Sequence, residues 1–109
     1  GSQTWRTIIG VYAAEFRRAG RGRHYMVRVI LPLYHPWSGK THAELEDVID
    51  RTVDGFTATE QGPGGRWALV IDTRASGYSS DWTLGILEQG VGELVAACRR
   101  AAEAQEVEA

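Results

Sequence analysis

Cysteine, proline and long hydrophobic runs are all scarce in this sequence. Its 109 residues include one cysteine and three prolines, and the net charge is −2. A lone Cys98 excludes an internal disulfide, so the cytosol is the expected compartment. No apolar run approaches the roughly 18 residues of a membrane span, which argues against a membrane partner. A chain of this charge is not expected to coat nucleic acid generally, but it is compatible with a local basic contact.

The composition is that of a single globular domain. Apolar residues make up 43% and charged residues 24% of the chain, and four Trp and four Tyr are available for a core. We expect one α+β domain over residues 3–105, with 1–2 an expression scar and 106–109 a frayed tail. A domain of this size often gains stability by oligomerising.

Four segments have the apolar, β-branched and aromatic content of strands. They cover residues 4–16, 24–33, 56–61 and 66–74. Pro32 removes a backbone donor, so the second segment should end or reach a sheet edge there. The sequence Gly62-Pro63-Gly64-Gly65 is a strong turn signal between the last two segments.

Two helices are expected between and after these strands. Thr41 and Glu44 have the spacing of a capping box, which begins a helix that should stop at Gly55. A second, longer helix should follow the loop over 75–82 and run to about residue 105. Its apolar stripe has helical spacing and consists of Leu87, Val91, Leu94, Val95, Cys98, Ala101 and Ala102.

The order β-β-α-β-β-α predicts a four-stranded antiparallel sheet with two helices on one face, as in a circular permutant of the ferredoxin-like sandwich. If odd positions face the helices, the other face carries Ile8, Tyr12, Phe16, Met26, Ile30, Ala68 and Val70. That is a large apolar area to leave in water. A homodimer packed sheet to sheet would cover it. A small apolar ligand, another partner, a cover formed by the long helix or a loop, or a strand register shifted by one residue are the alternatives.

The segment 17–23 holds four of the twelve Lys and Arg residues, namely Arg17, Arg18, Arg21 and Arg23. It lies between the first two predicted strands, so it should form a hairpin tip. Arginine binds phosphate and carboxylate groups through a planar fork. The tip is therefore a candidate site for an anionic partner, either a nucleic acid or an acidic protein. A solvated turn without a specific partner, or a set of salt bridges to an acidic helix such as the one over 44–50, are the alternatives.

These features favour a small non-enzymatic binding or accessory protein, dimeric through its sheet face. The rival hypothesis is a small cofactor-free enzyme of the dimeric α+β barrel kind, such as an isomerase, a cyclase or a monooxygenase-like protein. Its base would be His35 or Asp72, and Tyr12, Arg28 and Trp37 would shape its pocket. Each base also has a structural interpretation: His35 packed on Trp37, and Asp72 paired with an arginine.

No metal or cofactor is expected. The three histidines, His24, His35 and His42, do not have the spacing of a zinc site. The segment 38–41 resembles the end of a phosphate-binding loop, but the glycine arc that such a loop needs is missing.

Overall fold

The computed structural model describes residues 3–19, 24–52, 58–73 and 84–108. It contains five strands, two α-helices and two short 3₁₀ turns, η1 (Pro36–Gly39) and η2 (Pro63–Gly65). The strands and helices, in chain order, are β1 (Gln3–Ile9), β2 (Tyr12–Ala19), β3 (His24–Ile30), α1 (His42–Thr52), β4 (Ala58–Gln61), β5 (Trp67–Asp72) and α2 (Leu84–Glu108).

A tight turn at Gly10 and Val11 divides the segment predicted as one strand over 4–16 into β1 and β2. Ile9 pairs with Tyr12 across a two-residue loop. Gly10 has a φ of 62°, whereas the φ of Val11 is negative, which is the pattern of a type II′ turn with glycine at its first central position. The prediction of a single strand was wrong because this glycine reverses the chain.

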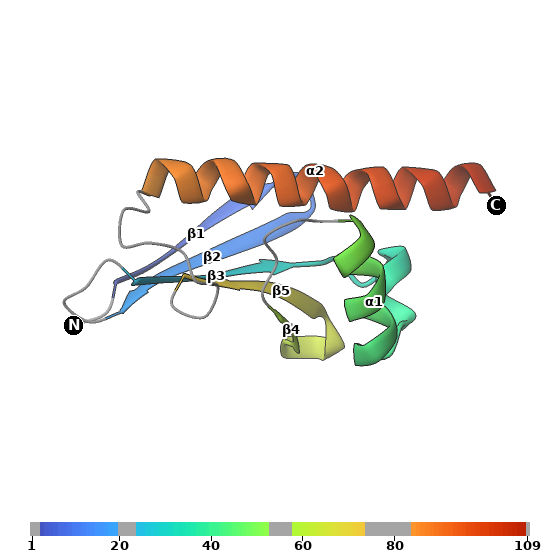
Figure 1. The fold of residues 1–109 in the computed structure, drawn as a ribbon, viewed down its shortest axis with the longest axis horizontal. Coiled ribbons are helices and arrows are strands. Elements are labelled where there is room, and N and C mark those ends of the chain that lie inside the picture. Colours follow the sequence, from blue (N-terminus) through green and yellow to red (C-terminus); the bar gives the residue numbers. More distant parts are fainter. Residues whose placement is uncertain (1–2, 20–23, 53–57, 74–83, 109) are drawn as a thin grey trace.

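The sheet is antiparallel throughout, with the strand order β1-β2-β3-β5-β4. Since β5 is antiparallel to both of its neighbours, β3 and β4 run parallel to each other with β5 between them, and α1 connects them (Figure 1). An α+β fold with one antiparallel sheet and two helices is confirmed. The four-strand count and the ferredoxin-like order were wrong, because the additional hairpin adds an edge strand.

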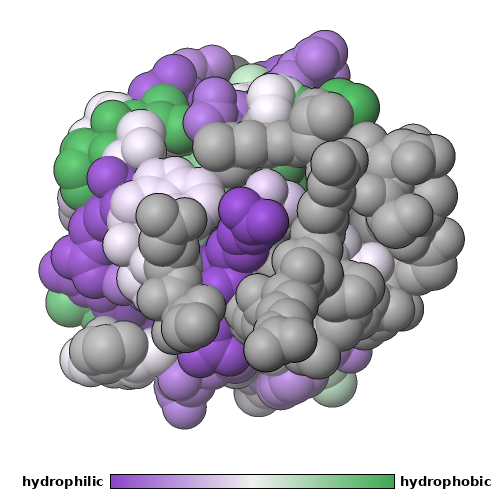
Figure 2. Space-filling view, turned by 90° about the vertical axis from the view of Figure 1, so that its left-hand side faces the viewer, coloured by the Kyte–Doolittle hydropathy of each residue, from purple (hydrophilic) through white to green (hydrophobic). Residues whose placement is uncertain are grey.

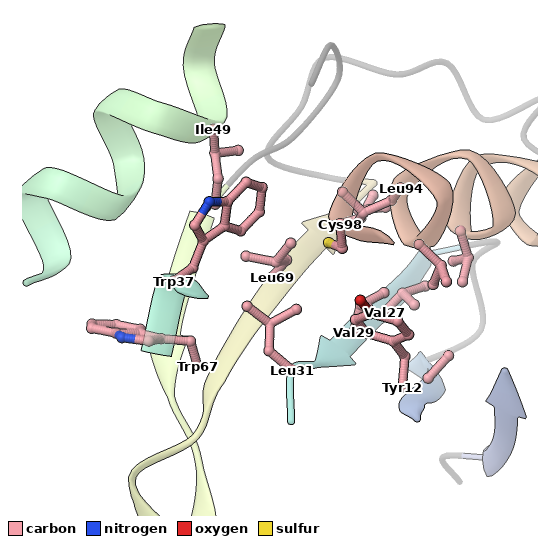
Figure 3. Close-up of a cluster of buried hydrophobic side chains, with 14 of the residues drawn as sticks. Tyr12, Val27, Val29, Leu31, Trp37, Ile49, Trp67, Leu69, Leu94 and Cys98 are labelled. Carbon is pink, nitrogen blue, oxygen red and sulfur yellow. The ribbon is translucent and has the colours of Figure 1, made fainter. Parts of the chain in front are cut away.

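Both helices pack on one face of the sheet, and the core lies between them and the strands (Figure 3). The predicted stripe of α2 is confirmed, with Leu87, Val91, Leu94, Val95 and Cys98 all buried. α1 contributes Leu45 and Ile49, which are fully buried. The sheet contributes alternate residues, including Val27, Val29, Leu31, Leu69 and Ile71. Burial of each such aliphatic side chain is worth about 1.5–3 kcal/mol, so this interface provides most of the stabilisation.

The placement of Tyr12 and Phe16 on the uncovered face was wrong. Their side chains are 3% and 2% exposed and belong to the core under the helices. Phe16 pairs with Trp5 in the sheet, and their rings stack with centroids 5.4 Å apart. Each odd-numbered residue of β1 pairs with an even-numbered residue of β2 across the hairpin. The odd-numbered residues of β1 therefore face the helices, and so do the even-numbered residues of β2.

The helix ends agree in part with the sequence. The capping box is confirmed: the Thr41 amide donates to Glu44 Oε1 at 3.2 Å, and the Glu44 amide donates to Thr41 Oγ1 at 3.3 Å. Gly55, the expected stop of α1, lies outside the described residues. α2 continues to Glu108, beyond the predicted end near residue 105. No helix in the described part of the chain has the length and hydropathy needed to cross a membrane.

Substitution of Gly10 by alanine should destabilise the fold by about 1–3 kcal/mol, because a non-glycine residue pays the strain of positive φ at this turn. A Cβ there would also lie 2.5 Å from Arg99 Nη2, which would have to move. Urea unfolding measures the loss. Gly39→Ala is the matched control, because a Cβ at Gly39 meets nothing within 4 Å and should cost little. Equal stability of the two variants would contradict this account of the turn.

Candidate functional site

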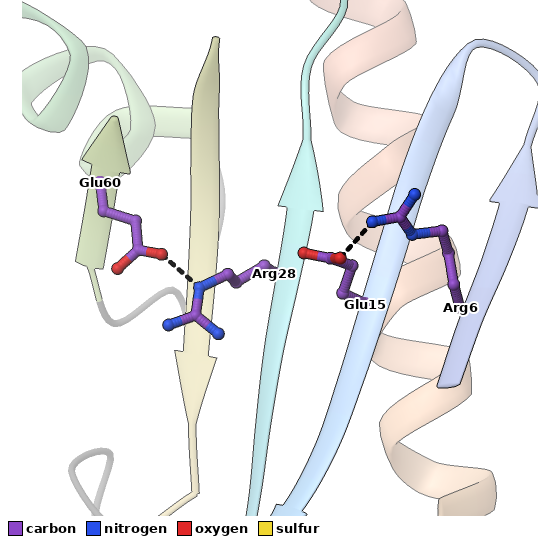
Figure 4. A network of polar contacts seen from close by, with 4 residues as sticks. All are labelled: Arg6, Glu15, Arg28 and Glu60. Atoms are coloured by element: carbon purple, nitrogen blue, oxygen red, sulfur yellow. Dashed lines mark hydrogen bonds and ion pairs between the residues drawn. The ribbon is translucent and has the colours of Figure 1, made fainter. Parts of the chain in front are cut away.

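A row of alternating charges crosses the sheet on the face opposite the helices, called here the open face (Figure 4). Arg6 pairs in register with Glu15, and Glu15 with Arg28. Arg6 donates to Glu15, and Arg28 donates to Glu60. We refer to these four residues as the charged row. It joins β1, β2, β3 and β4 through opposite charges, an arrangement that favours cross-strand pairing.

The charged row also shields apolar surface. Val70 lies opposite Arg28 in register, and the Arg28 side chain reaches past β5 to Glu60 (Figure 4). Val70 is only 6% exposed although no helix covers it. Ion pairs at such a surface are worth about 0–1 kcal/mol each, so the charged row adds little to the stability of the fold. Its main effect is to fix where positive and negative charges lie on the open face.

An apolar row lies next to the charged row, toward the Gly10 turn. Its members are aligned by the register of four strands: Ile8, Ala13, Ile30 and Ala68. Ile8 is 64% exposed, and Val11 in the adjacent turn is 56% exposed, whereas Ala68 at the other end of the row is only 1% exposed. The open face is thus less apolar than the sequence predicted, because Tyr12 and Phe16 face the helices, but a large isoleucine projects from it.

Arg17 and Arg18 lie near the end of β2, at the opposite end of the sheet from the Gly10 turn. Both are exposed, and neither side chain makes an ion pair or hydrogen bond with another described residue. Arg17 lies on the open face and Arg18 on the helix side, because successive residues of a strand point to opposite faces. Figure 2 views the molecule from this end and shows hydrophilic residues over much of its described surface. Arg21 and Arg23, the other two arginines of the predicted tip, lie outside the described residues.

His35 is buried between the sheet and α2, where its two ring nitrogens bind backbone groups. The Trp37 amide donates to His35 Nδ1 at 3.1 Å, and Nε2 donates to the Cys98 carbonyl at 2.9 Å. This pattern requires the neutral ring with its proton on Nε2. Burial lowers the pKa of His35 below its ordinary value of 6.5. The expected contact with Trp37 is present, with ring centroids 5.0 Å apart.

Tyr12 lies beside His35 and beneath Arg99 of α2. The Tyr12 and His35 ring centroids are 6.2 Å apart, and the Arg99 guanidinium carbon is 6.0 Å from the Tyr12 centroid. Burial raises the pKa of Tyr12, and it raises the pKa of the neighbouring Cys98 to about 12. All of these groups are therefore uncharged near neutral pH except Arg99, and the Cys98 thiol is not set up as a nucleophile.

The structure separates the residues proposed for catalysis. Tyr12, His35 and Trp37 lie together on the helix side, whereas Asp72 pairs with Met26 in register on the open face. Arg28 also lies on the open face, as predicted, but its carboxylate partner is Glu60. Among the described residues, no three His, Cys, Asp or Glu side chains are grouped so as to hold a metal ion.

The pairing of Arg6 with Glu15 and the roles of Glu60 and Arg99 were not predicted from the sequence. The signal for that pairing was present: a two-residue loop beginning with glycine between apolar strands indicates a hairpin. That hairpin sets Arg6 opposite Glu15. The role of Glu60 depends on the non-local pairing of β3 with β5, and that of Arg99 on the path of α2, so neither had a local signal.

No protein-family model, no curated protein and no solved structure matches this chain. Resemblance therefore assigns no residue a role. The candidate site consists of three features of known geometry: the charged row, the apolar row beside it, and the two arginines at the end of β2.

Replacement of His35 by glutamine should flatten the pH dependence of stability. Since the folded-state pKa is lowered, the unfolded chain binds more protons below pH 6.5, and the free energy of unfolding of the wild type falls as the pH is lowered through that value. Urea unfolding between about pH 7.5 and pH 5 measures the slope. The part of the slope due to His35 should disappear in His35→Gln. It should persist in His42→Gln, which removes an exposed histidine of α1.

Replacement of His35 by alanine should cost more at all pH values. It leaves the Trp37 amide without its buried acceptor, at about 1–3 kcal/mol, and it removes the ring's bond to the Cys98 carbonyl, which keeps its helical partner. A variant as stable as the wild type would show that the ring does not connect η1 to α2.

Proposed function

We propose that this protein is a small non-enzymatic binding protein that presents the arginines at the end of β2 to an anionic partner and acts as a homodimer through its open face. The observation that carries the proposal is the difference between the arginines of the sheet. Arg6 and Arg28 each have a glutamate partner. Arg17 and Arg18 have none among the described residues, and both are exposed.

This difference supports binding because an arginine side chain with no partner in the described part of the chain has its five donors available for an external ligand. The chain as a whole has a net charge of −2, so the basic end contrasts with the rest of the molecule. Arg21 and Arg23 continue the same segment of the sequence. The planar fork of arginine fits phosphate oxygens in a bidentate geometry, so we propose a phosphate-bearing partner.

The state of His35 gives further support to binding rather than acid–base chemistry. A general base must reach a substrate proton, and both nitrogens of this ring are occupied by backbone groups in a buried site. Asp72, the other candidate base, lies on the opposite side of the sheet and cannot act together with it.

The proposal predicts that Arg17→Ser/Arg18→Ser weakens binding to a short fluorescent DNA duplex, measured by anisotropy. The logarithm of the affinity should fall with the logarithm of salt concentration, and the slope should decrease by roughly one for each arginine lost from contact. The series runs from about 50 to 200 mM salt. Poly-glutamate is the second probe: tighter binding to it than to DNA would favour an acidic protein as the partner.

Arg66→Ser/Arg100→Ser is the matched control. It removes the same charge from two exposed arginines that lie away from this end of the sheet, and it should leave binding nearly unchanged. Equal weakening in both double variants would show that net charge, not the end of β2, determines the affinity. Absence of binding to either polyanion would overturn the proposed function.

A further inference from the structure

We infer that two copies of this chain pack open face to open face about a two-fold axis parallel to the strands, with the axis between β2 and β3. The inference rests on the proposed function for its biological meaning, and the side chains of the open face support it. A two-fold axis parallel to the strands sets β1 over β5 of the other copy and β2 over β3. In this arrangement the side chains of the open face are complementary to those of the other copy.

The charges of the central strands support this axis. Glu15 on β2 and Arg28 on β3 are neighbours in register on either side of the proposed axis. The rotation places Glu15 of one copy over Arg28 of the other, twice in each dimer. Arg6 then lies over Val70 of the other copy, and the Glu60 that binds this copy's Arg28 lies one strand further out, in register with Ala68. The two Glu15–Arg28 contacts across the interface are thus between opposite charges.

The apolar row agrees with the same axis. Its order across the sheet is Ile8, Ala13, Ile30 and Ala68, so large and small residues alternate. After the rotation Ile8 lies over Ala68 of the other copy, and Ala13 lies over Ile30. Each large side chain therefore meets a small one, which is the interdigitation that sheet packing requires. It would also cover Ile8, which is 64% exposed in the single chain.

The other simple two-fold axis fits poorly. An axis perpendicular to the strands along the charged row would set Glu15 over Glu15 and Arg28 over Arg28. An axis displaced from that row would lay charged residues over the apolar row of the other copy, where they would lose water without gaining a partner. The side-chain pattern therefore selects the parallel axis.

The available area suits a weak dimer. Ala68 and Val70 of β5 are already buried in the single chain, so the accessible patch is mainly that of β1, β2 and β3. Three strands of about seven residues cover roughly 14 × 23 Å, or about 320 Å² of plane for each copy. The total lies below the roughly 1,200 Å² of standard specific interfaces, so we expect the dimer to form at the upper end of the concentration range tested below.

This axis has a consequence for the proposed function. A rotation about an axis parallel to the strands keeps the direction of each strand, so the ends of β2 from both copies lie at the same end of the dimer. Arg17 lies on the open face, in register with Met26, so it would stand at the rim of the interface. Arg18 lies on the helix side of β2, so the Arg18 side chains of the two chains are both available at this end of the dimer. A polyanion long enough to contact both copies should bind far more tightly than a short one, because the second contact is intramolecular.

Charge reversal tests the dimer. Sedimentation of the wild type over about 1–300 µM should show a salt-resistant dimer of twice the 12.0 kDa chain mass at high concentration. Glu15→Arg alone and Arg28→Glu alone should each be monomeric, because each places like charges across the axis. An equimolar mixture of the two variants should again give the dimer mass. A wild type that is monomeric throughout, or single variants that stay dimeric, would overturn the inference.

Ile8→Glu provides an independent test that does not depend on the charged row. Its side chain is largely exposed, so the variant should fold, and it should be monomeric because the glutamate would lie over Ala68 of the other copy. Leu33→Glu is the matched control: Leu33 is 56% exposed but lies in the turn after β3, and this variant should stay dimeric. Circular dichroism confirms folding in both.

The position of the axis is tested by cysteine cross-linking. A chain with Ala13→Cys mixed with a chain carrying Ile30→Cys should form the mixed disulfide dimer in higher yield than either variant alone. The native Cys98 is buried, with a pKa raised to about 12, and should not compete. Equal yields from each variant alone would overturn the parallel axis.

Failure of the dimer and failure of anion binding are distinguishable. The monomeric Ile8→Glu variant should keep the wild-type affinity for a short duplex and lose at least tenfold in affinity for a long one. Arg18→Ser, which changes only the arginine on the helix side of β2, should stay dimeric and lose affinity for both. A dimer that binds no polyanion would overturn the proposed function and leave the interface supported, and equal affinity of dimer and monomer for the long duplex would overturn the joint binding by the two Arg18 side chains.

Discussion

The turn at Gly10 and Val11 is the constraint on which the rest of the structure depends. It pairs odd-numbered residues of β1 with even-numbered residues of β2, and this register determines which side chains lie on each face of the first hairpin. Tyr12 and Phe16 are directed under the helices, and Arg6 and Glu15 are directed to the open face. A one-residue change of register would exchange these sets, burying the ions and exposing the aromatic rings.

The helix side shows how a buried polar group is accommodated in this fold. His35 donates to a carbonyl in the middle of α2 and accepts from the first turn of η1, so one ring connects the loop after β3 to the longest helix. The ring is neutral, satisfied and surrounded by Tyr12 and Trp37. A histidine in such surroundings contributes to the arrangement of the core, and its low pKa follows from its burial.

Much of the fold could be predicted from local patterns. The capping box at Thr41, the stripe of α2 and the strands that became β3 and β5 all have periodicities or spacings that report on their own segment. The errors arose where the signal was short or not local. A single glycine between apolar residues can lie within a strand or reverse it, and 4–16 was assigned to one strand on its apolar content. The partner of Arg28 depends on the order of strands, which no local pattern encodes.

The two faces of the sheet differ in their physical role: one packs against the helices and the other is available for contacts between molecules. The helix face is close-packed, so changes there alter stability. The open face carries ion pairs that contribute little to folding, together with one exposed isoleucine, Ile8. A chain that needed only to fold would gain little from an ordered row of alternating charges beside a row of alternating large and small residues. Both patterns become useful in the proposed dimer, in which another copy of the same chain would provide a surface with the reversed pattern.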